Sequence, residues 1–138
     1  MKIYINDVNE DWIVDRFRKE FYQYNQNIVT TDISKADIIW VISPWAWRKV
    51  PKRFLSKKKV ICTIHHIDEE KFKGKEGKEF YKLDKYVDFY HTISEKSLNQ
   101  LNKLTRKKIY NIPFWVNNKI WFDIPDKDDL KRKYNLPH

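Results

Sequence analysis

The residues best suited to chemistry are two adjacent histidines, His65 and His66, which directly follow the apolar run 60–64. An imidazole can donate, accept or transfer a proton near neutral pH. Adjacent residues leaving a strand point in different directions, so one ring can face a cleft while the other packs. Two interpretations stay open: both histidines are structural, or at least one lines a catalytic site. No third ligand is spaced to make a metal site with them, so we predict no metal and no cofactor.

Other polar and aromatic side chains follow further short apolar runs. They combine hydroxyl, amide, carboxylate, guanidinium and indole groups, which suits the recognition of a sugar or another small polar ligand. The predicted substrate-binding residues are Asn6, Asp7, Ser43, Trp45, Trp47, Arg48, Ser94, Glu95 and Trp115. Structural alternatives stay open here too. Ser94 is a good N-cap with Glu95 in the first helical turn, and a tryptophan in a small domain often belongs to the core.

These residues can act together only if the fold brings them to one edge. Strand-like runs at 2–6, 28–31, 37–43, 60–64, 89–93 and 108–112 alternate with helical patterns. This alternation predicts an α/β fold: a Rossmann-like, doubly wound parallel sheet of about six strands, with helices on both faces, in a single domain. Ligands of such sheets bind at the carboxyl ends of the strands, where the residues above lie.

The helical patterns are less regular than the strands. Helices are expected near 10–25, 94–104 and 126–134, and short turns near 45–55. A further helix begins near Asp68, is interrupted by Gly74 and Gly77, and resumes at Phe80.

Composition excludes several classes of site. The chain has only two glycines, both in the segment GKEGK, so it lacks a glycine-rich phosphate loop. Its single cysteine cannot form an internal disulfide or a multi-cysteine zinc site. No apolar run is long enough for a signal peptide or a membrane span. We therefore expect a soluble, cytoplasmic protein.

The net charge is +9, and much of the positive charge lies in residues 48–59, where apolar residues are interleaved. A solvated face is the simplest interpretation. Alternatively, the stretch docks peripherally on an anionic membrane surface or a phosphorylated acceptor. Nucleic acid is the competing partner, but no helix-turn-helix, RNA-recognition or zinc-finger signature supports it, so we disfavour it.

Four segments in order carry a family resemblance: ADIIWVIS, KVICTIHHIDEEKF, YVDFYHTISEKSLNQL and IYNIPFWVNNKIWFDIPDKDDLKRKYNLP. Together they cover residues 36–137 and resemble the N-terminal, acceptor-side domain of glycosyltransferases of the family 4 type, which have the two-domain GT-B fold. Two departures stand out. Residues 114–117 read FWVN where the family has Asn-Gly-Val-Asp, and residues 6–9 lack the glycines that many members carry after the first strand.

The resemblance implies a hexosyltransferase-like enzyme that moves a sugar from a nucleotide-sugar donor to a glycan, lipid or other hydroxyl acceptor. It also implies a retaining, metal-independent reaction. Residues 1–125 would form the acceptor-side domain and residues 126–138 the start of a linker to a donor-binding domain absent from this sequence, without which the chain should be inactive. His65 or His66 would contact the donor sugar or orient the acceptor hydroxyl. The alternative is a non-enzymatic basic α/β domain that binds nucleic acid or an anionic surface.

Overall fold

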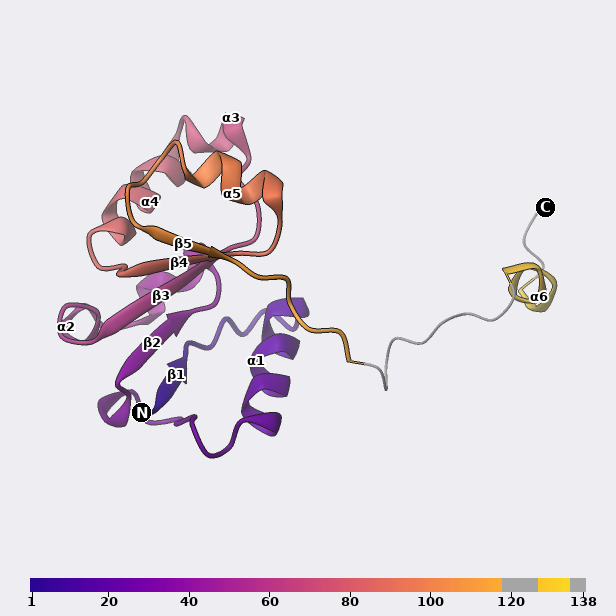
Figure 1. Ribbon diagram of the computed structural model, residues 1–138, viewed down its shortest axis with the longest axis horizontal. Coiled ribbons are helices and arrows are strands. Elements are labelled where there is room, and N and C mark those ends of the chain that lie inside the picture. The colour runs from indigo at the N-terminus through magenta and orange to yellow at the C-terminus, as the bar shows by residue number, and fades with distance from the viewer. Residues whose placement is uncertain (118–126, 135–138) are drawn as a thin grey trace.

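The computed structural model describes residues 1–117 and 127–134 (Figure 1). Within them the core is a sheet of five strands in the order β1-β2-β3-β4-β5, and every neighbouring pair is parallel. The α/β, Rossmann-like fold expected from the sequence is confirmed. The strands are β1 (Ile3–Ile5), β2 (Ile38–Val41), β3 (Lys59–Ile64), β4 (Phe89–Thr92) and β5 (Lys108–Asn111).

The prediction of a strand at residues 28–31 is wrong, because only an isolated parallel bridge joins Ile3 to Val29. The next hydrogen bond of a regular ladder would run from the Ile5 amide to the Thr30 carbonyl. The Tyr22 hydroxyl is inserted there instead: it accepts from the Ile5 amide at 3.2 Å and donates to the Thr30 carbonyl at 2.8 Å. The phenol thus replaces a ladder bond and ends the pairing after one bridge.

The bridge nevertheless shows that the chain changes direction across the sheet at this point. Helix α1 (Ile13–Tyr24) leads from β1 to the bridge at one edge of β1, and the chain then returns to pair β2 with the other edge. Right-handed crossovers taken in opposite directions place their helices on opposite faces. Accordingly, α1 lies on one face, whereas α4 (Lys75–Asp84) and α5 (Glu95–Leu101) lie on the other (Figure 1).

Two apolar cores follow from the alternation of side chains along the strands. In β2, Ile39 and Val41 join the larger core under α4 and α5, together with Leu83. Trp40 faces α1, where it packs against a smaller core that contains Phe17. The sheet is therefore covered on both sides, as parallel sheets generally are.

The remaining elements are short. Two 3₁₀ helices, η1 (Ile33–Lys35) and η2 (Pro44–Lys49), and helix α2 (Lys52–Leu55) precede β3. Helix α6 (Lys127–Lys133) confirms the helix expected at 126–134, although its expected cap, Asp126, lies outside the described residues. Among the described helices, none is long and apolar enough to cross a membrane.

The helix interruption predicted at Gly74 and Gly77 is confirmed at Gly74, which lies between two helices, and is wrong at Gly77, which lies inside the second. Helix α3 (Glu69–Phe72) is capped by the Asp68 carboxylate and ends before Gly74, and α4 then runs straight through Gly77. A Cβ atom at position 77 would lie 2.1 Å from the Phe72 carbonyl oxygen. Gly77 therefore allows α3 and α4 to pack closely.

We expect Gly77→Ala to destabilise the fold by about 1–3 kcal/mol, because backbone atoms must move to admit the new methyl group. Urea unfolding measures this change. The neighbouring exposed position gives the control: Lys78→Ala should stay within about 0.5 kcal/mol of the parent. Helix propensity alone predicts the reverse, a gain of about 1 kcal/mol for Gly77→Ala, and such a gain would contradict the close approach.

Candidate functional site

The edge between β1 and β2 is the switch point where this fold usually binds a ligand, but here it is filled by Asn6. That side chain is 1% exposed. Its Oδ1 accepts from the Ile42 amide at 3.0 Å, and its Nδ2 donates to the Ala46 carbonyl at 3.4 Å. Asn6, predicted to bind substrate, thus joins the end of β1 to the end of β2 and to η2.

The loop after β1 is shaped by one carboxylate. Asp15 accepts from the amides of Asn9 at 3.0 Å and Glu10 at 2.8 Å. Burial alone would raise the pKa of Asp15, but these amide hydrogen bonds outweigh it and hold the pKa below the usual value. Asn9 and Asp11 take positive φ angles of 58° and 53°, so the loop makes its turns without glycine. It presents acidic side chains, including the exposed Asp7, where phosphate-binding relatives of this fold present glycines.

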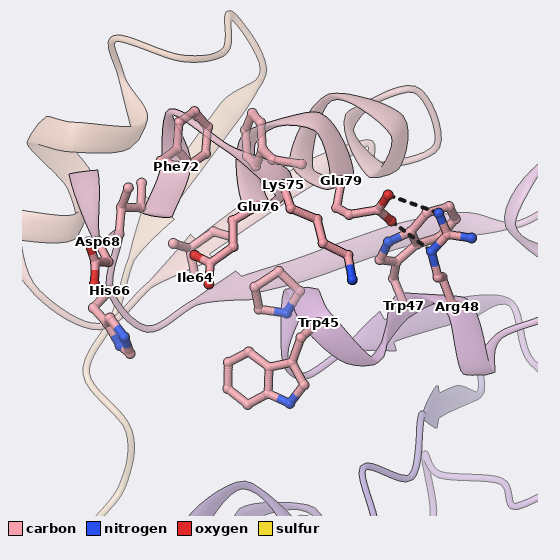
Figure 2. Close-up of a pocket in the computed structure, with 13 residues that line it drawn as sticks. Trp45, Trp47, Arg48, Ile64, His66, Asp68, Phe72, Lys75, Glu76 and Glu79 are labelled. Carbon is pink, nitrogen blue, oxygen red and sulfur yellow. Dashed lines mark hydrogen bonds and ion pairs between the residues drawn. The ribbon is translucent and has the colours of Figure 1, made fainter. Parts of the chain in front are cut away.

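One strand further along, a pocket of about 710 Å³ opens at the carboxyl ends of β2 and β3 (Figure 2). Its walls come from η2, the segment after β3, α3 and α4. Four of the predicted site residues, Trp45, Trp47, Arg48 and His66, meet here. The other lining residues are Pro44, Ile64, Ile67, Asp68, Phe72, Lys75, Glu76, Glu79 and Phe80.

The two tryptophans of η2 have different roles. Trp47 is 3% exposed and forms part of the larger core, so it forms the base of the pocket and does not offer a ring face to a ligand. Trp45 is 48% exposed at the mouth of the pocket. Its indole nitrogen donates to a Glu10 carboxylate oxygen at 3.3 Å, which holds the ring in place. Trp45 therefore offers an open aromatic face to a ligand.

A bidentate ion pair holds two walls of the pocket together. The Arg48 guanidinium donates to both Glu79 carboxylate oxygens, at 2.7 and 2.9 Å (Figure 2). Lys82 donates to the same carboxylate at 3.0 Å. Arg48 first, and Lys82 second, lower the pKa of Glu79 to about 2, and Glu79 in turn raises the pKa of Arg48. The pair is solvent-exposed, so it orients η2 against α4 more than it stabilises the fold.

The adjacent histidines face different surroundings, as their position after a strand predicted. His66 is exposed and lines the pocket. The His65 ring turns away and packs 5.5 Å from the Phe114 ring. Its Nε2 donates to the Ile42 carbonyl at 2.9 Å and lies 3.3 Å from the hydroxyl of the buried Ser43. Burial lowers the pKa of His65, so the ring is a neutral packing group.

His91, inside β4, belongs to a hydrogen-bonded chain across the sheet. The Trp40 indole donates to the Thr63 hydroxyl at 2.8 Å, and Thr63 lies 2.9 Å from His91 Nδ1. His91 Nε2 donates to the Ile112 carbonyl at 2.7 Å. Because a carbonyl only accepts, Nε2 carries the proton and Nδ1 accepts from Thr63. Burial also lowers the pKa of His91.

Three other predicted site residues have structural partners. Ser94 caps α5 by accepting from the Ser97 amide at 3.2 Å, and Glu95 accepts from Asn111 at 2.6 Å. The Trp115 indole donates to the Glu20 carboxylate at 2.7 Å. None of these three lines the pocket.

The contact of Trp115 with Glu20 fixes the segment after β5 to helix α1. The other Glu20 oxygen accepts from the Asn117 amide at 3.0 Å, and Phe114 stacks on Phe17 with ring centroids 4.0 Å apart. The hydrogen bond from Asn117 is the main reason that the pKa of Glu20 lies below its usual value, although the carboxylate is buried. The FWVN sequence thus packs on this domain.

The basic stretch 48–59 does not form one compact face. It runs from η2, at the carboxyl edge of the sheet, to Lys59, which begins β3 at the opposite edge. Four of its seven cationic residues have hydrogen-bond or ion-pair partners, and Arg53 lies over the Phe54 ring. Arg48, Lys49, Lys58 and Lys59 contact, respectively, Glu79, the Val8 carbonyl, the Ala36 carbonyl and Asp88.

The sequence interpretation missed the acidic and basic residues of the pocket wall. Lys75, Glu76 and Glu79 recur at helical spacing and could have indicated one face of α4. Gly77 among them was taken as a break in the helix, which hid that periodicity.

No protein family, curated protein or solved structure matches the chain. Within residues 1–117 and 127–134, no group of three or more His, Cys, Asp or Glu residues is arranged to hold a metal ion. The free thiol of Cys62 is buried, and burial raises its pKa, so it is not placed to act as a nucleophile.

The two packed histidines predict a pH-dependent stability. Both pKa values lie below 6.5 in the folded protein, so the unfolded chain binds protons first as the pH falls. The free energy of unfolding should be highest above about pH 6.5 and decrease as the pH falls through the two folded-state pKa values. Urea unfolding between pH 7.5 and 5 measures this dependence.

In the double variant His65→Gln/His91→Gln, the free energy of unfolding should depend less on pH. The control His66→Gln, which replaces an exposed ring, should keep the parental pH dependence. NMR titration of the ring protons gives a second readout on the unmodified protein. Titration of His65 and His91 at or above pH 6.5 would contradict the packing argument.

Proposed function

We propose that this domain binds the sugar acceptor of a glycosyltransferase, with the 710 Å³ pocket as the acceptor site. The observation that carries the proposal is the combination of an open Trp45 face with charged and imidazole side chains at the carboxyl edge of a parallel sheet. An aromatic surface with a few placed polar groups suits a carbohydrate, which presents apolar C–H faces and a rim of hydroxyls.

The donor belongs, in this proposal, on a second domain. The loop after β1 supports this division, because its acidic side chains and the filled switch point would disfavour a nucleotide diphosphate. The family 4 resemblance of residues 36–137 leads to the same division of labour. The acceptor-side domain alone then binds acceptor without turning it over.

His66 and Glu76 are the groups that would position the reacting hydroxyl. Both are exposed and line the pocket. Imidazole can donate to or accept from a hydroxyl, and a carboxylate accepts. Their contribution is orientation of the nucleophile toward the sugar held opposite, the entropic part of catalysis. The retaining, metal-independent course rests on the family resemblance alone.

Peripheral docking on the cytoplasmic face of an anionic membrane is a further part of the proposal. Lys52, Arg53 and Lys57 support it, because they are exposed around α2 and no described carboxylate pairs with them. Each of the three cations contributes about 1 kcal/mol to the free energy of binding to an anionic lipid surface. Such binding is therefore reversible.

A panel of neutral and acidic oligosaccharides tests the acceptor site, with tryptophan fluorescence and NMR shifts as readouts. We expect Trp45→Ala to weaken binding of a panel member by about tenfold or more, the usual effect of removing an aromatic anchor. Trp12→Ala is the matched control, because Trp12 is 67% exposed but does not line the pocket. It should leave the affinity unchanged.

Three outcomes would overturn the proposal. The first is absence of binding to every oligosaccharide, and the second is an equal loss in both tryptophan variants. The third is binding of RNA or DNA at about 50 mM salt that falls steeply as salt rises, which favours the nucleic-acid alternative. The same proposal expects the domain not to bind a nucleotide sugar.

A further inference from the structure

Lys75 is the unusual member of the pocket wall. It lies in the first turn of α4, and Figure 2 shows its side chain extending into the pocket, with the ammonium group between Trp45 and Trp47 in this view. No dashed line reaches it, and no described residue forms a hydrogen bond or ion pair with its ammonium group. Its charge is therefore available to a ligand.

The neighbouring carboxylates do not neutralise Lys75. Both oxygens of Glu79 are occupied, one by Arg48 alone and one by Arg48 and Lys82 together. The Asp68 carboxylate accepts from the backbone amides that begin α3. Glu76 extends to another part of the pocket, toward Ile64 (Figure 2).

The surroundings of Lys75 make its charge selective. Trp45, Pro44 and Phe80 supply apolar surface in the same pocket. A sugar that covers Trp45 would displace water from the ammonium group, and an unpaired charge loses hydration at a considerable cost. A ligand with an anion at that position removes the cost and gains a charge-assisted hydrogen bond. A neutral sugar does neither.

We propose that the pocket selects an acidic carbohydrate, whose ring lies on Trp45 and whose carboxylate or phosphate group pairs with Lys75. Hydroxyls on the far side of the ligand then meet Glu76 and His66, which line the other part of the pocket. This inference rests on the proposed acceptor site and specifies the class of sugar that it takes.

Three tetrasaccharides with one backbone test the selection: a neutral form, a form with one uronic acid and a form with one phosphate. Isothermal titration calorimetry at about 50 mM salt gives the affinities. We expect the parent protein to bind one or both acidic forms at least tenfold more tightly than the neutral form, the size of one charge-assisted hydrogen bond. The two acidic forms distinguish a carboxylate ligand from a phosphate ligand.

Lys75→Gln should abolish that tenfold preference while retaining binding of the neutral form. Lys78→Gln is the matched control, because Lys78 is an exposed lysine of the same helix that does not line the pocket. It should keep the full preference. Thermal unfolding verifies that both variants are folded.

The possible failures are distinguishable. Equal affinity of the parent for all three forms overturns the acidic selection and leaves the acceptor site in place. An equal loss of preference in Lys75→Gln and Lys78→Gln also overturns it, because the effect is then general charge. Absence of binding to all three forms, and to the wider oligosaccharide panel, overturns the proposed acceptor site itself.

Discussion

One buried amide fills the place where this fold usually binds a ligand. Asn6 is bonded to the Ile42 amide and the Ala46 carbonyl, so the ends of β1 and β2 and the start of η2 form one unit. A buried side chain that satisfies two backbone groups cannot be withdrawn without leaving both unpaired. The switch point is therefore filled, and a pocket opens one strand further along, between η2 and α4.

The pocket beside this unit depends on two long-range contacts. Gly77 lets α4 approach the end of α3, and the bidentate contact between Arg48 and Glu79 aligns α4 with η2. The same ion pair occupies the Glu79 carboxylate, which could otherwise pair with Lys75. The pocket thus contains both the unpaired cation of Lys75 and the open face of Trp45, and this combination gives it its chemical character.

Much of the fold was predictable because local patterns encode it. Short apolar runs identified the five strands that the described residues form, and the helical spacing of residues such as Phe17 and Phe21 identified α1. The strand predicted at residues 28–31 does not form, for a reason that no local sequence pattern encodes. Tyr22 lies on a neighbouring helix, yet its hydroxyl takes the place of the ladder bond between Ile5 and Thr30.

The sequence by itself determined which residues follow the strands, and hence that Trp45, Trp47, Arg48 and His66 share the carboxyl edge. Only the tertiary structure decided which of the candidates stay available. Asn6, His65 and Trp115 are polar or aromatic groups with suitable chemistry, but each is engaged by a partner distant in the chain. A buried polar group must find a hydrogen-bond partner, and folding alone settles which partner comes within reach.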